Sequence, residues 1–224
     1  MVSERRTFIK FCGIRTLADI NKAIALDIDA LGFICVPNRK RTVEEAELEK
    51  IIRFVPDGFL TVGVLMNPTV EIVEHWLSIA SFSAIQLHGD ESPQLCQQLK
   101  ERFPKTQMIK VFHIEPTTDH FHIEPYFPWI DVALFDASFS GQRGGTGRRF
   151  DWTKIPSFAA ICRRAKLPFW VAGGIDPSNV SQLVKTYHPD GIDVSSGIEQ
   201  NGVKDQEQMK ELVEKVRQID NSVC

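Results

Sequence analysis

Cys12 and Asp136 are the two side chains whose chemistry makes them candidates for an acid–base pair. A thiol has an unperturbed pKa of about 8.5 and becomes a base or nucleophile when that value is lowered. The carboxyl of Asp136 stands between Phe135 and Ala137, where loss of water can raise its pKa and keep it protonated. A base and an acid on opposite sides of one carbon suit a proton shift next to a carbonyl or imine. Two simpler interpretations stay open, a buried hydrophobe for the cysteine and a helix cap or salt bridge for the aspartate.

Two segments near the end of the chain combine glycine and serine in a way that suits phosphate binding. Gly173-Gly174 and Ser195-Ser196-Gly197 each follow an apolar run, and glycine lets backbone N–H groups approach an anion closely. Gly173-Gly174 alone can equally serve only to turn the chain, but the second segment makes phosphate binding the favoured interpretation. A third segment, residues 141–147, contains Gly145 and Gly147 and predicts a mobile lid, an anion cradle or a plain flexible connection.

Arg41 and His88 are two further candidates for contact with a substrate. Arg41 ends the basic triplet Arg39-Lys40-Arg41, and a guanidinium binds a carboxylate in bidentate fashion. Such a triplet is more often a solvated run of charge. His88 follows Gln86-Leu87 and can either polarise a substrate or play a structural part at the end of a strand.

These candidates follow short apolar runs that alternate with amphipathic stretches. The apolar runs predict strands at residues 8–12, 30–35, 61–66, 84–87, 108–112, 132–135, 169–172 and 191–194. The stretches between them predict helices at 16–26, 43–54, from Pro68, from Ser92-Pro93 to 103, short or broken within 115–128, within 150–164, from Pro177, and at 205–219. Eight such units predict a parallel sheet closed into a single (β/α)₈ barrel, whose active site lies at the carboxyl ends of the strands.

The bulk properties fit one such domain over residues 1–224 and exclude several classes of protein. A net charge of −3 argues against a nucleic-acid-binding surface, and the chain has no apolar run of the roughly 20 residues that a membrane span needs. The five cysteines are widely spaced, without metal-ligand spacing, which predicts reduced thiols, no metal site and a cytoplasmic protein.

The chain resembles phosphoribosylanthranilate isomerases over nearly its whole length. Each matching segment is weak alone, but together and in this order they are very specific. The segments are Lys10-Phe11-Cys12-Gly13-Ile14, Ala30-Leu31-Gly32-Phe33, Gln86-Leu87-His88-Gly89-Asp90-Glu91, Phe135-Asp136-Ala137, Gly144-Gly145-Thr146-Gly147 leading to Phe150-Asp151-Trp152, Ala172-Gly173-Gly174-Ile175, and Gly191-Ile192-Asp193-Val194-Ser195-Ser196-Gly197-Ile198-Glu199 running on to Gly202-Val203-Lys204-Asp205.

This resemblance implies an Amadori rearrangement of N-(5-phosphoribosyl)anthranilate in tryptophan biosynthesis, without a metal or organic cofactor. It implies that Cys12 is the general base, that Asp136 is the general acid and that Arg41 holds the anthranilate carboxylate. It places the phosphate on the backbone of Gly173, Gly174, Ser195 and Ser196, with help from the segment that holds Gly145 and Gly147. The expected partner is a small phosphosugar, and the expected state is a monomer or a homodimer.

The segment before Arg41 departs from the family pattern. The family often carries Ser-Pro there, where this chain has Arg39-Lys40, and Val36 replaces a common aromatic residue. The added positive charge predicts either tighter binding of an anionic substrate or acceptance of a different one.

Three rival functions make different demands on the sequence. A histidine-pathway isomerase would show two similar phosphate-binding halves, whereas the glycine signature is clear only in the second half here. A ribulose-phosphate epimerase would need metal-binding His/Asp sets at several strand ends. A non-catalytic phosphate-binding barrel would be favoured if Cys12 or Asp136 pointed away from the pocket.

Overall fold

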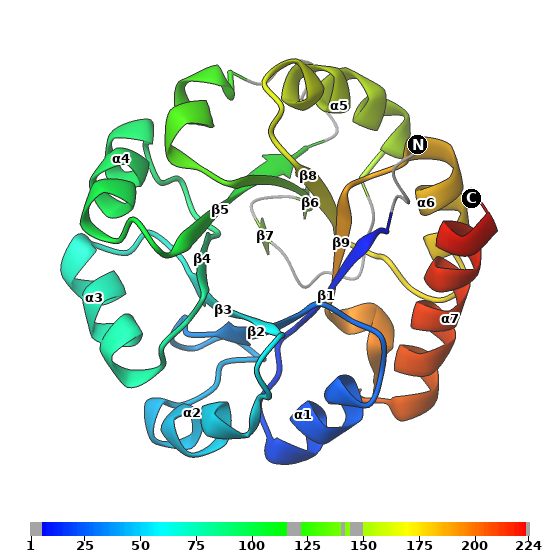
Figure 1. Cartoon of the computed structure of the whole chain (residues 1–224), viewed down its shortest axis with the longest axis horizontal. Helices are drawn as coiled ribbons and strands as arrows, with labels where there is room; N and C mark the ends of the chain where they lie inside the picture. Colours follow the sequence, from blue (N-terminus) through cyan, green and yellow to red (C-terminus); the bar gives the residue numbers. More distant parts are fainter. Residues whose placement is uncertain (1–5, 116–121, 140–141, 144–149, 223–224) are drawn as a thin grey trace.

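A computed structural model of the chain describes residues 6–115, 122–139, 142–143 and 150–222. Its centre is a closed ring of parallel strands, ordered β5-β4-β3-β2-β1-β9-β8-β6 and completed by pairing of β5 with β6 (Figure 1). This arrangement confirms the predicted (β/α)₈ barrel. The ring consists of β1 (Phe8–Cys12), β2 (Ala30–Ile34), β3 (Leu60–Leu65), β4 (Ala84–Leu87), β5 (Gln107–Ile114), β6 (Val132–Phe139), β8 (Phe169–Ala172) and β9 (Gly191–Val194).

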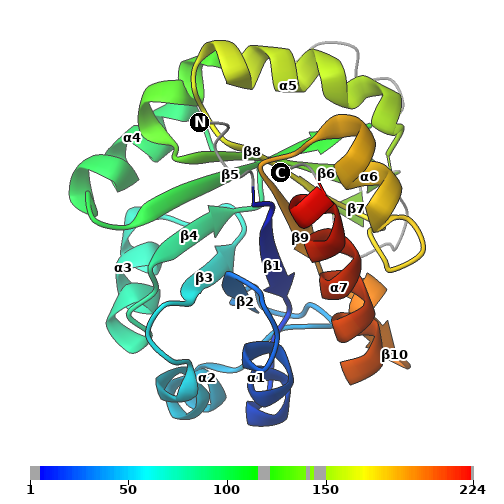
Figure 2. The ribbon, with the colours of Figure 1, turned by 45° about the vertical axis from the view of Figure 1, so that its right-hand side comes forward.

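Helices form an outer layer around the ring, as Figures 1 and 2 show. Thr16 and Ser92 cap their helices by accepting hydrogen bonds from the backbone N–H three residues later, and Pro93 occupies the first turn of its helix. The helices are α1 (Leu17–Ile24), α2 (Glu45–Ile51), α3 (Val70–Ile79), α4 (Pro93–Arg102), α5 (Ile155–Arg164), α6 (Val180–Tyr187) and α7 (Gln206–Ser222), with short 3₁₀ turns η1 (Ile52–Phe54), η2 (Glu124–Trp129), η3 (Trp152–Lys154) and η4 (Ser196–Ile198).

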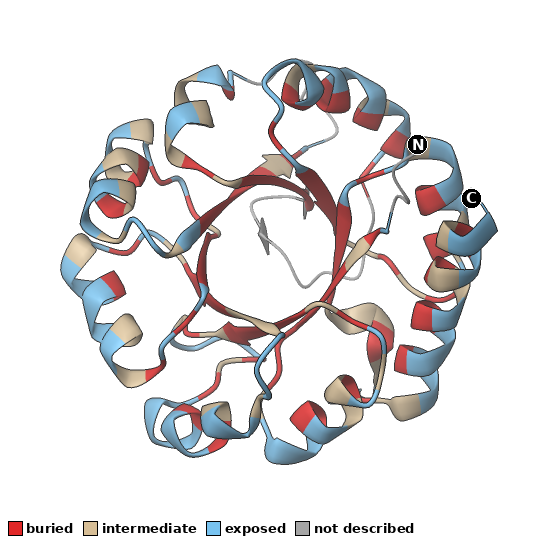
Figure 3. Cartoon of the chain, in the orientation of Figure 1, coloured by how far each residue is buried: buried red, intermediate tan, exposed pale blue. Residues whose placement is uncertain are grey.

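The alternation of side chains along each strand divides the apolar residues between two cores. Outward-facing strand residues and the inner faces of the helices form the larger core, visible in Figure 3 as the buried sides of the helices. Inward-facing residues fill the lower part of the barrel, where Phe8 stacks on Trp170 with ring centroids 4.6 Å apart. The polar inward residues lie nearer the carboxyl ends of the strands, above this apolar floor.

Three of the predicted helix starts were two or three residues too early. One is α2, predicted from residue 43, which begins at Glu45, and the other two involve a proline. Pro68 lies before α3, which begins at Val70 with Thr69 as its cap, and Pro177 lies in the turn before α6, which begins at Val180. In each case the proline belongs to the loop that leads into the helix. Two short strand pairs also escaped prediction, β7 (Gln142–Arg143) beside β6, and β10 (Glu199–Gln200) beside β11 (Val203–Lys204). Among the described residues, no helix has the length and apolar character needed to cross a membrane.

Candidate active site

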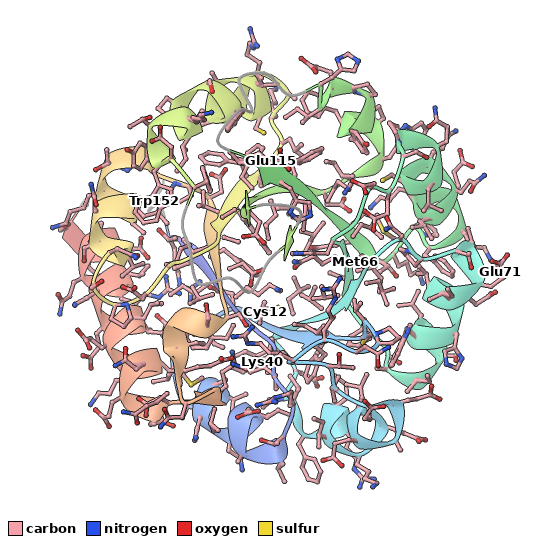
Figure 4. All side chains as sticks on the ribbon, turned by 180° about the vertical axis from the view of Figure 1, so that it is seen from behind. Cys12, Lys40, Met66, Glu71, Glu115 and Trp152 are labelled. Atoms are coloured by element: carbon pink, nitrogen blue, oxygen red, sulfur yellow. The ribbon has the colours of Figure 1, made fainter. Side chains whose placement is uncertain are left out.

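A cavity of about 260 Å³ opens at the carboxyl ends of the barrel strands. Its walls include all the described residues that the sequence singled out, namely Cys12, Arg41, His88, Asp136, Gly173, Gly174, Ser195 and Ser196. Gly145 and Gly147 lie outside the described residues. In Figure 4, Cys12, Lys40 and Met66 lie toward the middle of the barrel, whereas Glu71 lies on the outer ring of helices. The strand order therefore brings together side chains that are far apart in the sequence.

The thiol of Cys12 ends β1 and lies on the inner face of the barrel, buried at 6% exposure. Its neighbour across the strand pair is Gly32, where an added Cβ would lie 3.0 Å from the cysteine sulfur. Burial raises the pKa of Cys12, although the ammonium groups of Lys10 and Lys204 oppose that effect. On balance the surroundings of Cys12 therefore raise its pKa, which is the opposite of the lowering expected for a base.

Asp136 faces the same cavity from β6 and is 5% exposed. Burial, followed by the nearby negative charge of Asp193, raises the pKa of Asp136 to about 7. Gly173 makes room for this carboxyl, because a Cβ there would lie 2.7 Å from its Oδ1. Gly173 also has a φ of +85°, which favours glycine. The predicted rise in the carboxyl pKa therefore agrees with the surroundings of Asp136.

His88 lies beside the acid at the end of β4, with its Nε2 3.6 Å from Oδ2 of Asp136. Burial, and then the neighbouring ring of His113, lower the pKa of His88 well below its usual value. The histidine is therefore neutral near pH 7, and its contact with Asp136 is not an ion pair. A neutral imidazole can donate or accept one hydrogen bond toward a substrate oxygen. The side-chain Oε1 of the adjacent Gln86 is buried and has no hydrogen-bond partner among the described residues.

One group of described residues has the atom types of a metal site. His88, His113 and Asp136 each offer one ligand atom, and these atoms lie within 4.8 Å of one another. The positive charges of Lys10 and Lys110 contribute to lowering the His88 pKa, and the same charges disfavour a bound cation. Of the three side chains, His88 and Asp136 line the cavity.

Arg41 is held by a side chain that sequence reasoning did not single out. Its Nε and Nη2 donate to the two carboxylate oxygens of Glu199 at 2.7 and 2.8 Å. Lys204 donates to the same carboxylate at 2.9 Å, and together the two cations hold the pKa of Glu199 at about 2 despite its burial. One bidentate edge of Arg41 is therefore already occupied, and a substrate carboxylate would have to use Nη1. Arg39 and Lys40 line the same cavity.

The glycine and serine segments meet at one side of the cavity mouth. Gly174 shares the positive φ of its neighbour, at +64°, which turns the loop after β8 toward the loop after β9. The Ser195 hydroxyl donates to the backbone oxygen of Cys12 at 3.0 Å. That hydroxyl is therefore engaged within the protein, and an anion at this place would bind chiefly through backbone N–H groups.

Lys10 and Asp193 are buried polar residues to which the sequence reasoning gave no role. Their side chains form an ion pair at 2.8 Å on the inner face of the barrel, where Lys10 is fully buried. The available signal was a lysine and an aspartate within otherwise apolar strands, at positions that alternate with outward-facing residues.

Known proteins resemble this chain in sequence and in fold. The family model for N-(5′-phosphoribosyl)anthranilate (PRA) isomerase matches residues 9–215. N-(5′-phosphoribosyl)anthranilate isomerases are 37% identical in Acaryochloris marina, over 94% of this chain and 98% of the relative, and 39% identical in Brevibacillus brevis, over 94% of each.

Solved structures extend the likeness to three dimensions. A phosphoribosyl anthranilate isomerase in complex with reduced 1-(o-carboxyphenylamino)-1-deoxyribulose 5-phosphate superposes with a TM-score of 0.78 at 27% identity, over 95% of this chain and 99% of that one. Monomers generated from the dimeric enzyme of Thermotoga maritima give a TM-score of 0.78 at 26% identity, with the same coverage.

Proposed function

Because this chain belongs to the phosphoribosylanthranilate isomerase family, we propose that Cys12 and Asp136 are the base and the acid with which it carries out the family's reaction. The enzyme is an isomerase of tryptophan biosynthesis. It converts N-(5′-phosphoribosyl)anthranilate into 1-(2-carboxyphenylamino)-1-deoxyribulose 5-phosphate by an Amadori rearrangement.

The reaction needs one proton donor and one proton acceptor on the sugar. Asp136 donates its proton to the ribose ring oxygen, and the C1–O bond breaks as the nitrogen lone pair forms an imine. The Cys12 thiolate then takes the proton from C2, which gives an enolamine. The enolamine gains a proton at C1 and loses one from its C2 hydroxyl, which leaves the ketone product. General acid–base groups of this kind contribute about 10²–10⁴-fold each.

The carboxyl of Asp136 carries this proposal, because its pKa of about 7 keeps a proton available at neutral pH within the same cavity as the thiol. His88, next to that carboxyl, is placed to hydrogen-bond a sugar oxygen. The two anionic ends of the substrate suit different parts of the cavity wall. We assign the phosphate to the backbone of Gly173, Gly174, Ser195 and Ser196, and the carboxylate to Arg41.

Three further assignments complete the proposal. The whole chain acts as one catalytic domain, without a metal or organic cofactor, on a small phosphosugar. It works in the cytoplasm, consistent with the free thiols of Cys12, Cys35, Cys96 and Cys162. It is a monomer or a homodimer, the two states that occur for the Thermotoga maritima relative.

The test replaces the proposed base and separates binding from turnover. We expect Cys12→Ala to lower kcat by about 10²–10⁴-fold in a fluorescence assay that follows consumption of freshly made phosphoribosylanthranilate. Titration with the reduced product analogue should give an affinity close to that of the wild type. Cys35→Ala is the matched control, since Cys35 is another buried strand-end thiol and lies outside the cavity wall. Near-wild-type turnover of Cys12→Ala would remove the thiol from the mechanism.

A further inference from the structure

The buried ion pair between Lys10 and Asp193 lies directly below the proposed base. The two residues are cross-strand neighbours on β1 and β9, and Lys10 Nζ lies 2.8 Å from Asp193 Oδ1. Lys10 is 0% exposed and Asp193 is 7% exposed. Removing two such charges from water is costly, and well-packed apolar residues are often at least as stabilising in their place. Stability alone therefore does not explain why these charges are buried here.

The pair interacts electrostatically with both proposed catalytic groups, but its two charges affect them unequally. The Lys10 ammonium interacts with the Cys12 sulfur as well as with Asp193, and Gly32 leaves room for both groups. An added Cβ at Gly32 would lie 2.8 Å from Lys10 Nζ. Among nearby charges, Lys10 affects the Cys12 pKa most and lowers it, whereas Asp193 affects the Asp136 pKa most and raises it.

The arrangement of these two charges suits the protonation states that the reaction needs. The reaction needs a thiolate together with a protonated carboxyl. Free cysteine and aspartate have pKa values of about 8.5 and 3.9, so near neutral pH each is mostly in the wrong form. A positive charge beside the thiol favours the thiolate, and a negative charge near the carboxyl favours the protonated acid, so each charge acts in the direction that the reaction needs.

We propose that Lys10 and Asp193 are positioning residues for the isomerisation, the ammonium acting on the sulfur of Cys12 and the carboxylate acting on the carboxyl of Asp136. This inference rests on the roles assigned to Cys12 and Asp136 above. Neither residue of the pair needs to touch the sugar, because each acts through the catalytic group beside it.

Other charged or titratable groups also face the two catalytic side chains. Arg41, Lys204 and the thiol of Cys35 interact electrostatically with Cys12. On the acid side, His88 lies beside Asp136 at 3.6 Å, and His113 is its cross-strand neighbour. These groups are left intact in the test, so that a change can be traced to the ion pair.

The test measures kcat/KM against pH in Lys10→Met and Asp193→Asn. Because the Cys12 pKa lies above that of Asp136, the low-pH bend of the profile reports Asp136 and the high-pH bend reports Cys12. In Lys10→Met we expect the high-pH bend to move upward by at least one pH unit and the plateau of kcat/KM to fall at least tenfold. In Asp193→Asn we expect the low-pH bend to move downward. Thiolate absorbance near 240 nm, corrected with the spectrum of Cys12→Ser, should titrate at a higher pH in Lys10→Met without any need for turnover.

Lys110→Met is the matched control. Lys110 is a second buried lysine in a barrel strand, paired with Glu91 at 2.9 Å, but it alternates with inward-facing residues and so lies on the outer side of β5. Its substitution should leave the Cys12 titration in place. Far-UV circular dichroism checks that each variant folds. If Lys10→Met does not fold, the shift of the Asp136 pKa in Asp193→Asn tests the proposal by itself.

Two failures can be told apart. If Cys12→Ala or Asp136→Asn turns over substrate like the wild type, the proposed function falls and this inference falls with it. If those variants are inactive while the bends of the pH profile and the thiolate titration of the ion-pair variants match the wild type, only the positioning role is overturned.

Discussion

Asp136→Asn should make the enzyme more stable and less active, and the structure sets the size of both effects. The carboxyl has a pKa of about 7 when folded, against 3.8 for an unperturbed aspartate. Between these values the folded protein binds a proton that the unfolded chain has released, so stability falls as pH rises. A difference of about three pH units corresponds to about 4 kcal/mol, which is lost in full once the pH exceeds the folded value.

Asparagine has nearly the same shape as the protonated acid but never ionises. The gain in unfolding free energy of Asp136→Asn over the wild type should therefore grow by about 3 kcal/mol between pH 5 and pH 8, with most of the growth complete at the folded pKa of about 7. Over the same range kcat should be lower by about 10²–10⁴-fold, since the amide cannot donate the proton.

Urea unfolding at pH 5 and pH 8, with kcat measured on the same samples, tests both effects. Asp57→Asn is the control, because Asp57 is exposed and its substitution should change neither the unfolding free energy nor kcat by more than the experimental error. A stability difference that stays constant from pH 5 to pH 8 would refute the reasoning about the buried carboxyl. Unchanged kcat would refute its role as the acid.

Three further predictions concern the cavity wall. In the wild type, kcat/KM should level off above about pH 7, because Asp136 loses its proton there while the fraction of Cys12 thiolate still increases, and a profile that keeps rising tenfold per pH unit through pH 9 would contradict this. Arg41→Ala should raise KM at least tenfold with little change in kcat, measured beside Arg39→Ala; an effect confined to the Arg39 variant would move the carboxylate to that side chain. Gly173→Ala should lower kcat and destabilise the fold by about 1–2 kcal/mol in urea unfolding, because its φ of +85° disfavours alanine and the new Cβ would press on Asp136.

The sequence predicted the ring of strands well because apolar runs in parallel strands are short, continuous and separated by amphipathic helices. It also placed Cys12 and Asp136 in one cavity, since both face the inside of the same barrel, Cys12 at the end of β1 and Asp136 within β6. The starts of α3 and α6 were misplaced because a proline near a helix fits either its first turn or the preceding loop.

Contacts between loops could not be predicted. Glu199 binds one edge of the Arg41 guanidinium because the short hairpin β10–β11 places it there. Strands of two residues are too short to show a hydrophobic periodicity in the sequence. The Lys10–Asp193 pair joins residues 183 positions apart, and nothing local to either residue indicates the other. Alternation along the two strands showed only that both side chains face inward.

Arg41, Glu199, Lys204 and Ser195 form an unbroken chain of polar contacts across the mouth of the barrel. The guanidinium binds Glu199, and Lys204 bridges Glu199 to the backbone oxygen of Ser195 at 2.9 Å. If the carboxylate binds Arg41 and the phosphate binds beside Ser195, as proposed, these contacts join the two anion-binding parts of the cavity. They would hold the two anionic ends of a ligand at a set spacing, so the site would select molecules by their span as well as by their charge.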